Sequence, residues 1–69
     1  MSEFKRDVGK RIKEKRVAMK LSREEFSYQA DISPKFLYDI ESGRKGLSAE
    51  NLRKVAQALA VSTDWLVGI

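Results

Sequence analysis

The stretch LSREEFSYQADISPKFLYDIESG, residues 21–43, contains two helix starts separated by a very short connection. In each start an apolar residue precedes a serine and a second one follows four positions after it: Leu21, Ser22 and Phe26, then Ile32, Ser33 and Leu37. A serine at an N-cap accepts a hydrogen bond from the first helical turn, and the apolar pair packs together as a staple. Because only residues 30–33 separate the two helices, we expect a steep crossing, as in a helix-turn-helix over about 22–42.

The same start occurs twice more along the chain, at Ser48 and Ser62. At the first start, Glu25 follows Ser22 by three positions and completes a capping box. Pro34 stands at the first helical position, where its missing N–H costs nothing. The four starts predict helices with approximate bounds of 23–29, 34–42, 49–59 and 63–67.

An apolar stripe at helical spacing precedes these starts and predicts a first helix over residues 3–19. Its members are Phe4, Val8, Ile12 and Met19. Arg16 occupies a position on the same stripe where an apolar residue would be expected. A charge on a buried face needs a partner, because desolvating it alone costs several kcal/mol.

These elements predict an all-α fold in a single domain over residues 1–69, a compact five-helix bundle that contains the helix-turn-helix. A chain of this length buries only about 60% of the surface that its unfolded form exposes, so local encoding has to contribute to stability beside the core. The residues expected to face inward are Leu21, Phe26, Ala30, Ile32, Leu37, Ile40, Leu47, Leu52, Val55, Ala56, Leu59, Val61, Trp65 and Leu66.

Cysteine and histidine are both absent from the sequence. Disulfides and thiolate metal sites are thereby excluded, and the commonest catalytic base is missing, so no metal, cofactor or enzyme active site is predicted. No apolar run approaches the roughly 18–20 residues of a membrane span, and the N-terminal MSEFKRDVGK lacks the apolar core of a signal peptide. We therefore expect a cytoplasmic setting.

Positive charge is concentrated toward the N-terminus. The net charge is +4, and residues 1–23 hold nine of the fourteen Lys and Arg but only three of the ten Asp and Glu. A basic end favours a polyanionic partner, either nucleic acid or anionic lipid. Ordinary solubilising charge gives the same pattern, so the charge by itself leaves both interpretations open.

Three motifs coincide within residues 11–66, RIKEKRVAMKLSREEFSYQADISPKFLYDIESGRKGLSAENLRKVAQALAVSTDWL: LSREEF, ISPKFLYDIESG and LAVSTDWL. In these motifs the chain resembles the Cro/CI-type (XRE family) helix-turn-helix domain of lambdoid phage repressors and many bacterial regulators. The resemblance implies a lambda-repressor-like fold and a sequence-specific transcriptional regulator, a repressor of bacterial or phage type, that binds double-stranded DNA. It further implies a homodimer on a palindromic operator, with the third helix in the major groove.

The resemblance also assigns roles to individual residues around the third helix. Those that would face the bases are Ser33, Pro34, Lys35, Tyr38 and Asp39. Those that would meet the DNA backbone or the edge of the groove are Arg23, Phe36, Ser42, Arg44 and Lys45. Arg16 and Glu41 match a structural salt bridge of the family, which supplies the partner that a buried Arg16 requires.

Residue chemistry supports a DNA-reading face on the third helix independently. Lys35, Tyr38 and Asp39 fall on one side of the helix, opposite its apolar residues. A lysine can donate to guanine, an aspartate can accept from cytosine, and a ring can contact a thymine methyl. Two roles for Asp39 stay open: it reads a base, or it holds Lys35 in place, since a carboxylate repels phosphates. An ordinary solvated face is the alternative for the whole set.

The chain departs from the family pattern at several helix ends. Asp31 replaces the turn glycine, and Lys20 and Ala60 stand where helix-ending glycines are common, each at a cost of up to about 1 kcal/mol. Ser27 stands where a small alanine usually lets the second and third helices approach, so its hydroxyl needs a backbone acceptor.

With one domain in the chain, dimerisation is expected to use that same domain. The apolar C-terminal residues Leu66, Val67 and Ile69 are the predicted contact. Two other classes of function stay open. One is a protein-binding module of antitoxin or anti-repressor type on the same fold, and the other is a non-specific nucleoid or membrane-surface binder that uses the basic first helix.

Overall fold

The computed structural model describes residues 3–69, and within them it confirms the predicted all-α, five-helix fold. The helices are α1 (Glu3–Ala18), α2 (Arg23–Ala30), α3 (Pro34–Glu41), α4 (Ala49–Leu59) and α5 (Thr63–Val67). The bounds expected from the sequence differ from these by at most one residue, with α1 and α3 ending earlier and α2 later. No helix in the described residues is long and apolar enough to cross a membrane.

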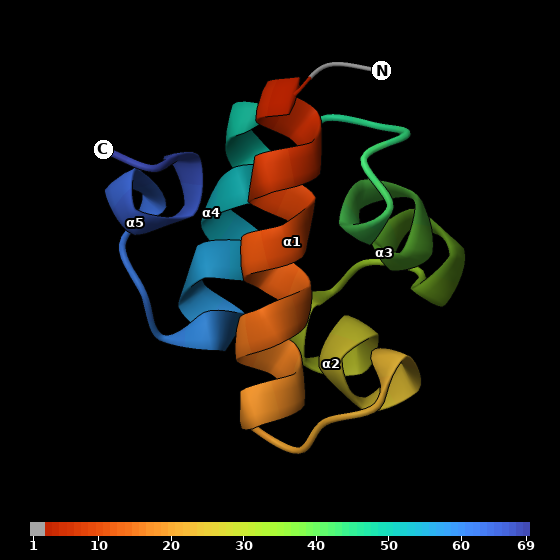
Figure 1. Cartoon of the computed structure of the whole chain (residues 1–69). Helices are drawn as coiled ribbons and strands as arrows, with labels where there is room; N and C mark the ends of the chain where they lie inside the picture. The colour runs from red at the N-terminus through yellow and green to blue at the C-terminus, as the bar shows by residue number, and fades with distance from the viewer. Residues whose placement is uncertain (1–2) are drawn as a thin grey trace.

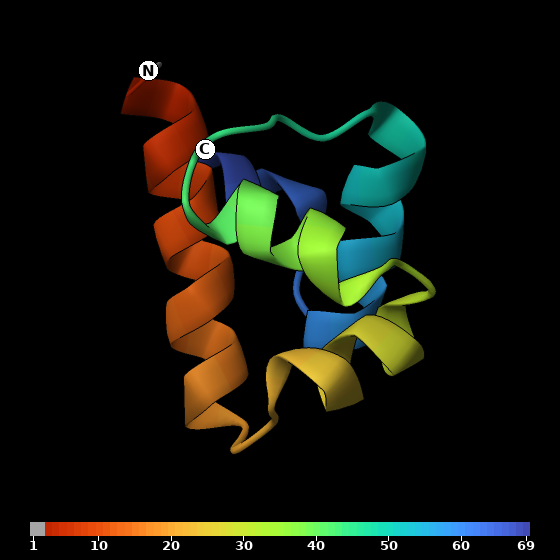
Figure 2. The same ribbon diagram turned by 90° about the vertical axis from the view of Figure 1, so that its right-hand side faces the viewer.

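The longest helix, α1, crosses the middle of the view in Figure 1, and the view turned by 90° shows that it lies along one side of the molecule (Figure 2). In Figure 1, α4 and α5 lie on one side of α1, and α2 and α3 lie on the other. The view turned by 90° shows α3 in front, with α2 beside it on the side toward the C-terminal end of α1 (Figure 2). The tight turn between α2 and α3 therefore places both helices at the edge of the bundle.

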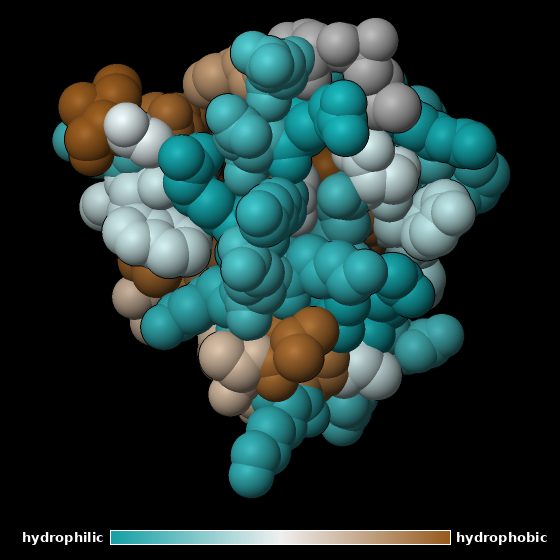
Figure 3. Space-filling model, viewed as in Figure 1, coloured by the Kyte–Doolittle hydropathy of each residue, from teal (hydrophilic) through white to brown (hydrophobic). Residues whose placement is uncertain are grey.

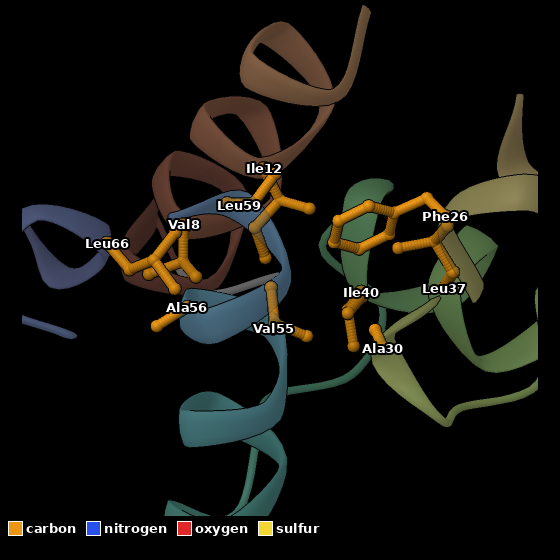
Figure 4. Packing of buried hydrophobic residues seen from close by; sticks show 10 residues of the cluster. All are labelled: Val8, Ile12, Phe26, Ala30, Leu37, Ile40, Val55, Ala56, Leu59 and Leu66. Carbon is orange, nitrogen blue, oxygen red and sulfur yellow. The ribbon is translucent and has the colours of Figure 1, made fainter. Parts of the chain in front are cut away.

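Side chains from all five helices meet in one apolar core (Figure 4). Phe26 of α2 and Leu37 of α3 are fully buried, which ties the helix-turn-helix to the rest of the bundle. The complete cluster is Val8, Ile12, Phe26, Ala30, Leu37, Ile40, Val55, Ala56, Leu59 and Leu66. Five other residues expected to face inward pack partly buried against this cluster: Leu21, Ile32, Leu47, Leu52 and Val61.

Three residues expected on the inner face are exposed, and these expectations were wrong. Phe4 is 57% exposed because it lies one turn beyond Val8, near the N-terminal end of α1. Met19 is 37% exposed because α1 ends at Ala18, so the helical stripe does not extend to it. Trp65 is 42% exposed because α5 has little more than one turn, and Leu66 takes its inward position.

The four serines cap their helices as the sequence predicts. The hydroxyls of Ser22, Ser33, Ser48 and Ser62 each accept from the backbone N–H three residues on, at 3.0–3.1 Å. At α2 the capping box is complete, because the backbone N–H of Ser22 also donates to Oε1 of Glu25 at 2.8 Å. That backbone hydrogen bond, followed by the one with the Ser22 hydroxyl, lowers the pKa of Glu25.

The three positions where the family commonly has glycine adopt the left-handed backbone conformation. Their φ angles are 61° at Lys20, 58° at Asp31 and 59° at Ala60. A residue with a Cβ pays roughly 1–2 kcal/mol there, although aspartate tolerates the region better than most. Asp31 also lies 3.4 Å from Nζ of Lys54 on α4, a contact between the turn and the bundle.

Two details of how the helices pack could not be read from the sequence: a close approach of α1 to α3 at Gly9, and the hydrogen bonding of the buried Ser27 hydroxyl. A Cβ at Gly9 of α1 would overlap the carbonyl oxygen of Ile40 and would lie 2.7 Å from that of Glu41, so α1 packs directly on the backbone of α3. Ser27 of α2 is 1% exposed, and its hydroxyl has no hydrogen-bond partner among residues 3–69. The backbone acceptor expected for Ser27 is therefore missing, at a cost of about 1–3 kcal/mol.

Candidate nucleic-acid interface

The N-terminal half of α3 presents an exposed polar face. Leu37 and Ile40 are fully buried on its inner side. Ser33, Pro34 and Lys35 are exposed, and Tyr38 is 48% exposed. The structure therefore brings together four of the five residues that the resemblance assigned to base reading. Phe36, assigned to the edge of the groove, is half-buried against the core.

Asp39 differs from the other four, because it is only 3% exposed. Its Oδ2 atom lies 3.4 Å from Nζ of Lys35, four residues earlier, and 3.6 Å from Nζ of Lys45 in the following loop. In this structure the carboxylate of Asp39 faces these two ammonium groups and not solvent. Of the two roles left open for Asp39, holding Lys35 fits this geometry, and base reading stays a prediction.

Arg16 and Glu41 form a buried, two-pronged ion pair between α1 and α3. Nε of Arg16 donates to Oε2 of Glu41 at 2.7 Å, and Nη2 donates to Oε1 at 3.2 Å. Nη1 of Arg16 donates to the carbonyl oxygen of Leu21 at 2.7 Å. Their side chains are only 7% and 2% exposed, so the pair belongs to the scaffold beneath the polar face.

Glu41 also holds a second arginine, which sequence reasoning missed. Nε of Arg23, the first residue of α2, donates to Oε1 of Glu41 at 3.2 Å. The guanidinium carbon of Arg23 lies 5.3 Å from the centre of the Tyr38 ring, within cation–π range. Since the Arg23 side chain remains 38% exposed, it is held in place and still open to an anion from solvent. Spacing in the sequence gives no signal for a contact between residues so far apart.

A surface hollow of about 200 Å³ lies where α1, α2 and α3 meet. Two cations, Lys13 and Arg23, and the hydroxyl of Ser42 line it. Glu41 and Tyr38 complete the lining. Lys13 was not singled out from the sequence, although it precedes Arg16 by three residues and so lies on a neighbouring part of α1. Figure 3 shows that hydrophilic side chains cover most of the face over α1.

The loop after α3 is anchored to the end of that helix. The carbonyl oxygen of Asp39 accepts from the hydroxyl of Ser42 at 3.1 Å and from the backbone N–H of Arg44 at 2.9 Å. Gly43, with φ of 81°, allows the sharp turn. Arg44 and Lys45 are exposed beyond it, so their charges lie close to the C-terminal end of α3.

The predicted dimer contact at the C-terminus is only partly available. Leu66 is fully buried in the core of its own chain, so its side chain is not exposed to contact a second copy, contrary to the prediction. Val67 is half-buried and lines an apolar hollow of about 170 Å³ together with Phe4 and Leu52. Ile69 is 91% exposed, and Figure 3 shows an apolar patch beside the C-terminal end of α5.

Comparison with known proteins places this geometry in a family. A family model described as a helix-turn-helix domain matches residues 9–67. The chain is 34% identical over 58 residues to an uncharacterized transcriptional regulator in the ATPase CF(0) region of Rhodospirillum rubrum, covering 84% of this chain and 54% of that protein. It is 38% identical over 61 residues to the immunity repressor protein of Bacillus phage phi105, covering 88% and 42% respectively. The chain thus spans about half the length of these relatives.

Solved structures are similar over nearly the whole chain. The restriction-modification controller protein C.AhdI from Aeromonas hydrophila matches with a TM-score of 0.86 at 27% identity, over 90% of this chain and 94% of that one. The clp gene regulator ClgR from Corynebacterium glutamicum matches with a TM-score of 0.84 at 26% identity, over 96% and 86%. The resemblance inferred from the sequence motifs is confirmed: the chain belongs to the helix-turn-helix domain family.

Proposed function

We propose that this domain binds double-stranded DNA in a sequence-specific manner and regulates transcription as a repressor, with α3 in the major groove. The observation that carries the proposal is the exposed polar face at the N-terminal end of α3, with cations on both sides of it. A helix placed at the edge of a small bundle can enter the groove, which is about 12 Å wide. The repressor of phage phi105, a relative of this chain, supports repression over activation.

Within this proposal the base-reading residues are Ser33, Pro34, Lys35 and Tyr38. Lys35 donates to guanine O6 or N7, and Tyr38 and Pro34 offer apolar contact to a thymine methyl. The backbone contacts come from the cations on either side of α3 and from Ser42, and Phe36 lies at the edge of the groove. The proposed backbone set is Arg23, Phe36, Ser42, Arg44 and Lys45.

Two alanine variants test these roles on duplexes selected from a random library at two salt concentrations. Lys35→Ala is expected to relax specificity at one base pair by about 1–3 kcal/mol, because it removes a donor to a base edge. Arg44→Ala is expected to weaken binding to all sequences alike and to reduce the salt slope by about 0.9, since it removes one phosphate contact.

The selection experiment also separates the other classes of function. A defined motif with a steep salt dependence supports the proposal. Binding without an enriched motif would instead identify a non-specific binder. Absence of any binding to duplex DNA would leave the protein-binding module as the function of this fold.

We further propose that two copies bind together on a palindromic operator, through the apolar surface at Val67 and Ile69. One recognition helix reads few base pairs, so two copies about one helical turn apart supply the affinity that a specific site requires. Ile69 is nearly fully exposed, and Val67 continues the apolar surface toward Phe4.

Ile69→Glu tests this contact without disturbing the core, because the side chain lies outside it. The variant is expected to raise the dissociation constant of the dimer about tenfold or more, since it puts a charge in place of an isoleucine that the proposed contact would bury. Sedimentation equilibrium measures the change. The control is Tyr28→Glu, which adds the same charge at a residue that is 89% exposed. It belongs to α2, a helix on the other side of α1 from α5 (Figure 1). An unchanged dimer in Ile69→Glu would refute the proposed contact.

A further inference from the structure

We propose that Asp39 is a positioning residue that holds two lysines of the DNA-binding surface and thereby sets its discrimination between base sequences. This inference rests on the proposed function. One oxygen of Asp39, Oδ2, lies 3.4 Å from Nζ of Lys35 and 3.6 Å from Nζ of Lys45. The same atom therefore faces the ammonium group of Lys35 on α3, which is proposed to read a base, and that of Lys45 in the loop after α3, which is proposed to contact the DNA backbone.

The burial of the three side chains is unequal, and this inequality shows which group fixes the others. The Asp39 side chain is 5% exposed, whereas those of Lys35 and Lys45 are 84% and 59% exposed. A lysine is a flexible chain that ends in a compact charge, so exposed lysines sample many directions. A carboxylate fixed in the fold restricts where both ammonium groups lie.

The backbone of Asp39 is fixed by the same loop. Its carbonyl oxygen accepts from the Ser42 hydroxyl at 3.1 Å and from the backbone N–H groups of Arg44 and Lys45 at 2.9 Å and 3.3 Å. Both the main chain and the side chain of Asp39 thus join the end of α3 to the loop. The distance between the base-facing Lys35 and the phosphate-facing Lys45 is therefore set before DNA arrives.

A carboxylate on a DNA-binding surface lowers affinity for every duplex, because it repels phosphates and neutralises a nearby cation. The loss is useful where the restricted lysine favours one base over another. With its ammonium group held beside α3, Lys35 can donate to a base acceptor at one position of the duplex. It then gains less binding free energy from phosphates on duplexes that lack this acceptor. Asp39 therefore lowers the affinity for all duplexes and raises the ratio between the affinities for matching and non-matching duplexes.

The test compares the wild-type protein with Asp39→Asn, which keeps the shape of the side chain and removes its charge. Affinities are measured for the selected duplex and for a scrambled duplex of equal length. The variant is expected to bind the scrambled duplex more tightly, with a salt slope steeper by about 0.9, as Lys45 gains a phosphate. The ratio of the two affinities is expected to fall about tenfold. Adding Lys45→Gln to Asp39→Asn is expected to remove the extra salt dependence.

Glu14→Gln is the matched control, because it raises the net charge equally at an exposed residue of α1. It is expected to leave the affinity ratio unchanged. The mobility of the lysine ammonium groups, measured by NMR in the free protein, gives a readout that needs no DNA. Lys35 and Lys45 are expected to be more restricted than the exposed Lys20, and to lose that restriction in Asp39→Asn.

The outcomes separate this inference from the function on which it rests. Equal lysine mobility in the wild-type protein and in Asp39→Asn would overturn the positioning role while leaving the proposed function intact. An unchanged affinity ratio in a folded Asp39→Asn would overturn the role in discrimination. A wild-type protein that selects no motif would overturn the proposed function and the discrimination together, while restricted lysines would still support the contact itself.

Discussion

Replacing Glu41 by alanine is expected to lower the free energy of unfolding by about 3–5 kcal/mol. Its carboxylate is the partner of Arg16, whose side chain is only 7% exposed. Without it, Arg16 keeps the carbonyl oxygen of Leu21 but carries an uncompensated buried charge. Small domains are stable by on the order of 5–15 kcal/mol, so this single change removes a large part of the total. Chemical denaturation followed by circular dichroism measures it.

Two further variants isolate the cause of that loss. Arg23→Ala removes the other arginine on Glu41, and it is expected to cost no more than about 1 kcal/mol because that side chain is partly solvated. The double variant Arg16→Met with Glu41→Leu is expected to recover most of the stability, since both buried charges disappear together. If the double variant proves as unstable as Glu41→Ala, the loss comes from packing and not from the unpaired charge.

Gly9→Ala is expected to have the second large effect, a destabilisation of about 3 kcal/mol. Alanine normally stabilises a helix relative to glycine by about 1 kcal/mol, so helix propensity by itself predicts the opposite sign. The new Cβ would overlap the carbonyl oxygen of Ile40 and lie 2.7 Å from that of Glu41. Because backbone atoms cannot rotate away, α1 and α3 would have to move apart.

Gly46→Ala provides a matched glycine in a different environment. Its Cβ would lie 3.3 Å from Cε of Lys5, the far end of a flexible side chain, so we expect less than about 0.5 kcal/mol. Thermal unfolding of both variants under the same conditions makes the comparison. A Gly9→Ala protein as stable as the wild type would show that the close approach of α1 to α3 is not a constraint. Separation of α1 from α3 would also strain the pair of Arg16 and Glu41, so losses at the two sites are not expected to add.

The helix starts could be predicted from the sequence because each is a local event. A serine, the N–H group three residues on and the staple partner lie within six residues, so their spacing contains nearly all the information. The helix ends were less well predicted than the starts, since those of α1, α2 and α3 each differ by one residue, and α1, α2 and α4 are followed by left-handed conformations at Lys20, Asp31 and Ala60 without glycine. There the packing of the bundle overrides the local preference.

The candidate site was predictable to the extent that it lies on one helix. Spacing along α3 separates buried Leu37 from exposed Lys35 and Tyr38. Exposure at the ends of elements was not predictable, as Phe4 and Trp65 show, because it depends on where neighbouring helices stop. The burial of Asp39 was not predictable either, because it depends on the loop that follows α3, whose path the sequence does not specify.

The sequence by itself therefore determined the helices, their caps and the family, all of which depend on residues within a turn or two of one another. The tertiary structure alone decided that Gly9 touches the backbone of α3, that Glu41 holds Arg23 in addition to Arg16, and that Asp39 faces Lys45 in addition to Lys35. Arg23 and Glu41 lie 18 positions apart, and Gly9 lies even farther along the chain from the α3 backbone that it touches. Periodicity fixes which face a side chain occupies, but only the packing of that face against another element fixes what it meets.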